Sequence, residues 1–288
     1  MVRQLLRFTV MQLCCLAPMS LHAADHKDEQ ASPDLEIQII FDNTSAREDL
    51  RRGWGFSALI DFRGHRILFD SGSDPILLLE HFELMQIDPK SIEHAIISHE
   101  HGDHLRGVYW VFEKNPDLKV HFLDCFPEAA FRRAKALNMD PHRITGPFEL
   151  VPGVFSTGTV EGLPSEQSLV IESSLGPVML VGCSHPGIVK LVKTVQEQRQ
   201  QDQIRYLLGG FHLLRKDPEV IKQTITELQD LNVQAVSPAH CSGDLAIEMF
   251  QTLYGSQFYE PGVGRRIVID NGKLTVSTLP VKVQAPGK

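Results

Sequence analysis

Four side chains able to bind a metal ion stand in one short segment, and this cluster constrains the fold more than any other feature. His99, His101, Asp103 and His104 follow a largely apolar run over residues 92–97, which predicts a buried strand. Imidazole and carboxylate groups suit zinc, iron or manganese. His99 and His101 can face one pocket after the strand, while Asp103 and His104 face a neighbouring position. The alternative, a solvated loop rich in histidine, is weakened by the buried strand before it.

Two pairs of ligands do not complete two metal sites, and three histidines further along the chain are candidates for the rest. His185, His212 and His240 each follow an apolar run and have glycine nearby. A lone histidine is more often a surface residue or a hydrogen-bonded core residue, but this shared context favours metal binding by His185 and His240. Two glycines before His212 allow close approach of a substrate. We therefore predict that His212 contacts substrate or orients a ligand.

The remaining pattern predicts a layered α/β fold. An antiparallel meander of strands comes first, strand–helix repeats follow, and strands end the chain, which favours helices on the outside of sheets. Several histidines follow strands, and ligands collect at the carboxyl ends of strands in open α/β sheets. Helices are predicted over residues 75–84, 127–138, 188–199 and 218–231. Strands are predicted over residues 35–41, 56–62, 66–69, 92–97, 148–155, 168–172, 178–181, 206–208, 233–236, 266–269 and 274–278.

The first residues predict an export signal. Arg3 and Arg7 precede an apolar run, and small residues near Ala23 supply a cleavage site. The run is short for a membrane span, so an uncleaved anchor and an ordinary first helix are the weaker alternatives. The mature protein is therefore expected in the periplasm or the medium, with no stable membrane insertion. The predicted parts are a signal peptide over 1–23, a flexible segment over 24–34, one domain over 35–280 and a tail over 281–288.

Charge and cysteine content limit the partners of the chain. The formal net charge is -8 and no cluster of Lys and Arg stands out, so nucleic acid is not an expected partner. The expected partner is a small-molecule substrate. After cleavage the chain keeps Cys125, Cys183 and Cys241, which cannot all pair within one chain. Cys183 and Cys241 stand beside proposed ligand histidines. Three interpretations are open for them: metal-binding thiolates, a pair brought close by the fold, or buried apolar side chains. The last is the commoner case for free cysteine.

The clustered residues resemble the His-x-His-x-Asp-His signature of the metallo-β-lactamase superfamily, and residues 70–72 resemble its preceding Asp-x-Gly element. The likeness covers about residues 36–276 and implies a four-layer αββα sandwich. More narrowly, the chain resembles the branch known as 7,8-dihydropterin-6-methyl-4-(β-D-ribofuranosyl)-aminobenzene-5'-phosphate synthase-like. That likeness is carried by Asp42-Asn43-Thr44, Trp54-Gly55-Phe56-Ser57 and the segments 182–187, 209–213 and 238–241.

The resemblance implies a role for each candidate ligand. One metal would be held by His99 and His101 with His185 nearby, and the other by Asp103, His104 and His240. The chain also departs from the superfamily pattern. Its usual Thr-Pro-Gly-His loop has no counterpart, because Ser156-Thr157-Gly158-Thr159 stands there, and Gly182-Cys183-Ser184-His185 replaces the expected bridging aspartate. Asp70 has a competing role as an acceptor that orients a histidine.

Hydrolysis is the function that these features favour. Two divalent transition-metal ions, with zinc favoured over iron and manganese, would supply a metal-bound hydroxide that attacks an ester, phosphodiester, lactone or amide. Asp103 and His212 are the expected catalytic residues. The alternatives are a transferase that resembles the pterin synthase, and a non-catalytic module that binds a metal or ligand on the same fold.

Overall fold

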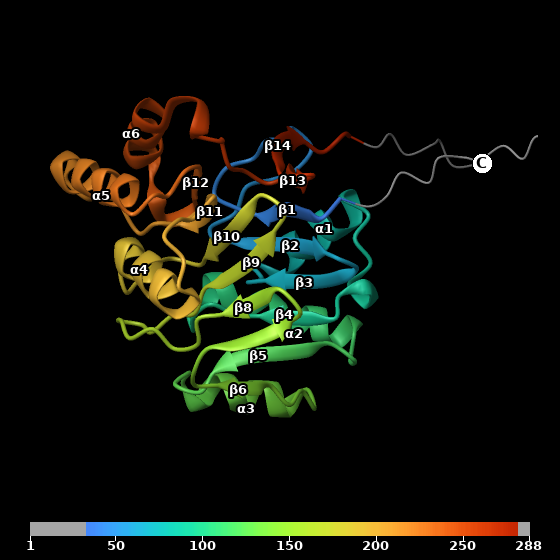
Figure 1. Cartoon of the computed structure of the whole chain (residues 1–288). Coiled ribbons are helices and arrows are strands. Elements are labelled where there is room, and N and C mark those ends of the chain that lie inside the picture. Colours follow the sequence, from blue (N-terminus) through green and yellow to red (C-terminus); the bar gives the residue numbers. More distant parts are fainter. Residues whose placement is uncertain (1–32, 282–288) are drawn as a thin grey trace, which may run out of the picture. The chain divides into compact units, whose positions relative to one another are not determined.

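The computed structural model describes residues 33–281, which form two β-sheets with helices on their outer faces (Figure 1). The predicted signal peptide, and nearly all of the predicted N-terminal segment and C-terminal tail, lie outside the described residues. The predicted boundaries of these parts therefore stay predictions. No helix in the described range is both long enough and apolar enough to cross a membrane.

The first sheet has eight strands and contains the predicted meander. In the order in which they lie side by side, they are β14 (Lys273–Thr278), β13 (Arg265–Asp270), β1 (Leu35–Phe41), β2 (Ser57–Phe62), β3 (His65–Phe69), β4 (His94–Ile96), β5 (Lys119–Leu123) and β6 (His142–Ile144). β1, β2 and β3 pair antiparallel, as predicted, whereas β3 to β6 run parallel. The carboxyl end of β4 leads directly into the histidine cluster.

The second sheet has six strands, and half of it is parallel. In spatial order they are β12 (Val236–Ala239), β11 (Tyr206–Gly210), β10 (Gly176–Val181), β9 (Leu169–Ser173), β8 (Val154–Ser156) and β7 (Phe148–Val151). β10, β11 and β12 run parallel. Because the carboxyl ends of parallel strands meet at one edge of a sheet, the loops after these three strands lie together.

Six helices complete the four layers of an αββα sandwich, which confirms the predicted fold (Figure 1). Three apolar clusters separate the layers: one between the first three helices and the first sheet, one between the sheets, and one between the second sheet and the last three helices. The first three helices are α1 (Pro75–Leu84), α2 (Gly102–Lys114) and α3 (Glu128–Ala136). The last three are α4 (Ile188–Arg199), α5 (Pro218–Asp230) and α6 (Asp244–Tyr254).

Local sequence explains where several helices begin and which face they bury. At the start of α1, the Asp74 carboxylate accepts hydrogen bonds from the backbone N–H of Ile76 and Leu77, and Pro75 opens the first turn. The apolar residues of α4 recur every three or four positions and are buried against the second sheet. Both helices have the bounds that the sequence predicts.

Three predicted strands were wrong in extent. Residues 148–155 form a hairpin rather than one strand, because Pro152 and Gly153 separate β7 from β8 and Gly153 has a φ of +85°. The strand predicted over residues 233–236 begins only at Val236, and Val233 makes an isolated bridge. The run over residues 92–97 is a strand only at its centre, in β4. The elements α2, α6, β5 and β6 were not predicted.

Candidate metal centre

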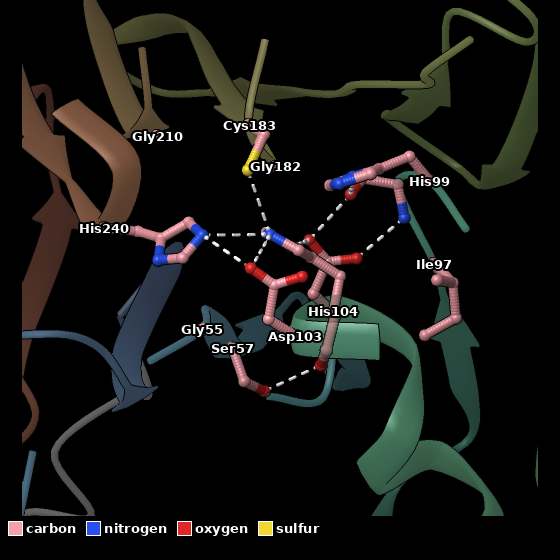
Figure 2. A network of polar contacts seen from close by, with 12 residues as sticks. Gly55, Ser57, Ile97, His99, Asp103, His104, Gly182, Cys183, Gly210 and His240 are labelled. Atoms are coloured by element: carbon pink, nitrogen blue, oxygen red, sulfur yellow. Dashed lines mark hydrogen bonds and ion pairs between the residues drawn. The ribbon is translucent and has the colours of Figure 1, made fainter. Parts of the chain in front are cut away.

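The candidate ligands converge on one place in the described structure, and Figure 2 shows His99, Asp103, His104 and His240 there. His99 and His101 follow β4, and Asp103 and His104 lie in the first turn of α2. The other three histidines each follow one of the parallel strands of the second sheet: His185 follows β10, His212 follows β11 and His240 follows β12. These segments therefore meet at the carboxyl ends of strands, as the sequence predicted.

A first ligand group consists of His99, His101 and His185. One donor atom from each lies within 4.8 Å of the others. The ring centroids are 4.9 Å apart for His99 and His101 and 4.7 Å apart for each of the other two pairs. His99 is buried, whereas His101 is exposed, so one side of this group faces solvent.

A second ligand group consists of Asp103, His104 and His240. Their donor atoms also lie within 4.8 Å of one another. His240 Nε2 is 3.3 Å from Asp103 Oδ2 and 3.2 Å from His104 Nε2 (Figure 2). The two groups adjoin, because the rings of His99 and His104 have centroids 4.2 Å apart. The structure thus gathers all six predicted metal ligands into the two predicted groups.

Asp70 orients two of the histidines. Its Oδ2 accepts hydrogen bonds from His104 Nδ1–H at 2.7 Å and from the Ser98 hydroxyl at 2.8 Å. Because the single hydroxyl proton of Ser98 is donated to Asp70, its Oγ accepts from His99 Nδ1–H at 2.9 Å. The Nε2 atoms of His99 and His104 therefore point into the centre. Asp70 takes the orienting role that was the alternative to a ligand role.

Asn43 and Trp54 fix the second ligand group from another side. Asn43 Oδ1 accepts from His240 Nδ1–H at 2.9 Å, and its amide NH₂ donates to the His240 carbonyl oxygen at 3.1 Å. This contact orients the His240 ring so that its Nε2 faces Asp103 and His104 at the centre. The Trp54 indole N–H donates to Asp103 Oδ2 at 2.8 Å. Gly55 beside it is required, because a Cβ there would lie 2.4 Å from the Asp103 carbonyl oxygen.

Glu166 holds the loop that carries Cys183 and His185, and the sequence analysis did not identify it. Its Oε1 accepts hydrogen bonds from the backbone N–H of Gly182, Cys183 and Ser184 at 2.9–3.0 Å. Its Oε2 accepts from His185 N–H at 2.9 Å. Burial raises the pKa of Glu166 to about 7, although the hydrogen bonds from this loop favour the carboxylate. One buried side chain therefore sets the conformation of the whole loop.

The ionisation of the centre suits a cation. Burial and the neighbouring histidines hold the pKa of His99 well below its usual value and lower that of His185 to about 3, so both are neutral imidazoles. Burial opposes a charge on Asp103, but its hydrogen bond with His240 and the nearby imidazoles hold its pKa below the usual range. Neutral imidazoles and a carboxylate are the forms that bind divalent metals.

The chain's donors fit a metal ion, because several have no other partner. The Nε2 atoms of His99 and His185 are buried and make no hydrogen bond. A buried polar atom without a partner costs about 1–3 kcal/mol, and a cation between such atoms would remove that cost. The first ligand group therefore has the geometry, protonation and unused lone pairs of a metal site.

Two cysteines and His212 lie next to these groups. Cys183 Sγ is 3.1 Å from His104 Nε2, and the Sγ–H of Cys241 donates to the Cys183 carbonyl oxygen at 3.5 Å. His212 is exposed, and its ring centroid is 4.4 Å from that of His185. The hydrogen bond with Cys241 raises the pKa of His212. Cys125, the third free cysteine, lies elsewhere and is exposed.

Comparison with protein families decides the superfamily. The family model of the metallo-beta-lactamase superfamily matches residues 51–240. The chain belongs to the metallo-beta-lactamase superfamily. Members of this superfamily typically bind divalent metal ions, and most are enzymes. The predicted recognition from the histidine and aspartate cluster is confirmed.

Several proteins are similar to this chain. The 7,8-dihydropterin-6-methyl-4-(beta-D-ribofuranosyl)-aminobenzene-5'-phosphate synthase of Methanocaldococcus jannaschii is 29% identical over 264 residues, 74% of this chain and 89% of the relative. An uncharacterised protein of the same archaeon is 25% identical over 266 residues, 81% of this chain and 100% of its own length. Both are similar along most of the described part of this superfamily member.

Solved structures share the superfamily fold. Tm1679, described as a metal-dependent hydrolase of the beta-lactamase superfamily, matches with a TM-score of 0.67 and 22% identity, over 82% of this chain and 99% of that one. A diphosphatase of the PhnP family matches with a TM-score of 0.58 and 15% identity, over 82% and 98%. At these identities the likeness shows the fold alone.

Proposed function

We propose that this protein is a metal-dependent hydrolase that acts on a small molecule with an ester, phosphodiester, lactone or amide bond. The observation that carries the proposal is the pair of adjoining ligand groups, His99, His101 and His185 beside Asp103, His104 and His240. Two divalent ions held by these groups, with zinc favoured over iron and manganese, would activate a water molecule and stabilise developing negative charge.

The chain's own residues prepare the centre for this chemistry. Asp70 and Asn43 each hold a histidine Nδ1–H, so that the Nε2 atoms face inward without further rearrangement. Trp54 fixes the carboxylate of Asp103, which we place in the catalytic centre as an anionic group. Orientation of this kind is established before substrate binds and is a large part of what an enzyme contributes.

The rim of the centre supports a small-molecule substrate. Trp54 is 52% exposed while its indole N–H remains bonded to Asp103, so its ring is open to a ligand. His101 and His212 are exposed on the same centre. We propose that His212 contacts the substrate by hydrogen bonding and that it is not needed for metal binding.

Metal analysis combined with a substrate panel tests the proposal. The purified protein should carry up to two transition-metal ions per chain after reconstitution with zinc, iron or manganese, and should hydrolyse at least one member of a panel of chromogenic esters, phosphodiesters and lactones. The double variant His101→Ala, Asp103→Ala should lose most of both ions. His142→Ala, at an exposed histidine of β6 outside both ligand groups, is the matched control and should keep them. Wild-type protein that binds no metal refutes the proposal.

A synthase reaction is the second candidate, and the 29% identical relative favours it. That reaction would form the pterin product named for the relative. Incubation of the metal-loaded protein with a ribofuranosyl-aminobenzene phosphate and a 7,8-dihydropterin that carries a leaving group on its 6-methyl carbon, followed by mass spectrometry, distinguishes the two functions, because the leaving group departs as the C–N bond forms. Product formation without hydrolysis of any panel member would replace the hydrolase. Metal binding with neither reaction would indicate a non-catalytic binding module.

We further propose export as the setting for this activity. The basic start and short apolar run before Ala23 support a signal peptide, and a periplasmic or secreted mature protein. The net charge of -8 repels phosphate backbones, so we also propose a small-molecule partner rather than nucleic acid. N-terminal sequencing of the protein from cell fractions tests this: a cytosolic protein that still begins at Met1 would show that the location is wrong.

A further inference from the structure

The thiol of Cys183 lies between the two ligand groups. Its Sγ is 3.1 Å from Nε2 of His104, in the second group, and within 4.8 Å of a donor nitrogen of His99, in the first. Figure 2 shows the sulfur pointing toward His104 and Asp103 from the loop after β10. The side chain is buried, yet its sulfur faces imidazole nitrogens rather than an apolar core.

The position of Cys183 is shared between the groups in a way that no other described residue matches. It belongs to three of the five sets of close donor atoms in the described chain. Within those sets it meets His99 and His185 from the first group and His104 and His240 from the second. No other residue of residues 33–281 meets two members of each group. A donor atom near ligands of both ions is what a bridging ligand requires.

The backbone keeps Cys183 in this position. Its N–H donates to Glu166 Oε1 at 3.0 Å, and the flanking N–H groups of Gly182 and Ser184 donate to the same oxygen. A Cβ on Gly182 would lie 2.0 Å from the hydroxyl oxygen of Ser98, so only glycine allows the loop to pass this close to Ser98. These hydrogen bonds and this close approach therefore fix the position of the Cys183 thiol.

We propose that Cys183 binds metal as a thiolate shared by the two ion positions, and that Cys241 is not a ligand. The inference rests on the proposed metal-dependent function. On binding, the Cys183 S–H bond breaks, its proton passes to solvent and the sulfur lone pairs are shared with the cations. Cys241 belongs to one set only, and its sulfur is hydrogen-bonded to the Cys183 carbonyl oxygen, to the Cys183 sulfur and to His212. A thiolate in the ligand set favours zinc over manganese.

Cobalt substitution tests the assignment with a readout separate from activity. The metal-stripped protein, kept under reductant, is titrated with Co²⁺ while its near-ultraviolet spectrum is recorded. We expect a thiolate-to-cobalt charge-transfer band that is lost in Cys183→Ser and kept in the matched variant Cys241→Ser. Cys183→Asp replaces the thiolate with a carboxylate, so it should bind cobalt with visible d–d bands and no charge-transfer band.

The outcomes separate this inference from the proposed function. If wild-type protein binds cobalt without a charge-transfer band, or if Cys241→Ser loses the band and Cys183→Ser keeps it, the assignment of Cys183 is wrong while the metal-dependent function stands. If wild-type protein binds no cobalt, the proposed function fails. Should Cys183→Ser not fold, as judged by circular dichroism, zinc-edge X-ray absorption on Cys241→Ser replaces it: a Zn–S distance of about 2.3 Å supports Cys183, and its absence overturns it.

Discussion

Replacing Glu166 by glutamine should loosen the loop that carries Cys183 and His185. The glutamine side chain has one carbonyl oxygen, which is best placed where three backbone N–H groups converge at the present Oε1. Its amide NH₂ then faces His185 N–H at the position of Oε2, so two donors meet and His185 loses its acceptor. A buried donor left without a partner costs about 1–3 kcal/mol, which is the loss of unfolding free energy we expect for Glu166→Gln.

Urea unfolding of the metal-stripped protein measures this loss without a contribution from bound metal. Burial raises the pKa of Glu166 to about 7, and at about pH 8, which is above that pKa, the wild-type side chain is mainly a carboxylate. Glu161→Gln, at an exposed glutamate of the same segment, is the matched control and should change stability by less than about 0.5 kcal/mol. Because His185 would lose its fixed position, Glu166→Gln should also weaken metal binding by about 10–100-fold. Equal stability and equal metal affinity in the two variants would refute the role given to Glu166.

Three further perturbations probe separate parts of the molecule. His240→Ala should lower metal content at the second group and abolish turnover, whereas His212→Ala should keep the metal and reduce turnover; metal analysis showing the reverse would exchange their roles. Trp54→Phe removes the indole donor to Asp103 but keeps an aromatic ring, so it should weaken metal binding about tenfold in competition with a chelator. An unchanged metal affinity would contradict the role of this contact. Burial, followed by neighbouring histidines, lowers the pKa of His121 to about 3, so between about pH 7 and 5 the unfolded chain gains a proton that the native chain does not. The native state should lose about 2 kcal/mol over that interval from this residue, and His121→Phe should remove that loss; an unchanged pH dependence of urea unfolding in the variant would refute it.

The sequence predicted well which candidate ligands lie together, because the signals for them are local. Four donors share one segment after a strand, and the other histidines follow strands that turned out to be parallel neighbours. The end of a buried strand is readable from apolar runs and glycine, and strand ends converge in such sheets. Topology therefore brought together residues more than a hundred positions apart, such as His104 and His240, without any need to predict their contacts.

Other elements were missed although their signals are present. In α2, Leu105, Val108 and Phe112 recur every three or four residues and are buried, which is a helical pattern. No element was predicted there, and the helix opens with glycine and candidate metal ligands and has no capping side chain. The hairpin of β7 and β8 likewise has a turn signal in Pro152 and Gly153.

The role of Glu166 has no local signal at all. Its partners stand 16 to 19 residues later in the chain and are backbone N–H groups, which every residue except proline carries. A buried carboxylate that binds four backbone donors is therefore recognisable only in three dimensions. The orienting contacts of Asn43 and Trp54 are similar: the resemblance marked their segments, but the structure supplied the reason for those residue types.

The orientation of the candidate metal-binding side chains is a property of the whole fold rather than of the ligand motif. His104 depends on Asp70 from the end of β3, His240 depends on Asn43 from the end of β1, and His185 depends on Glu166 from the segment before β9. Each of these three candidate ligands thus comes from one element, and the group that orients it comes from another. Ligand position and tertiary packing are coupled for this reason, so changes to the orienting groups should act on metal affinity and on stability together.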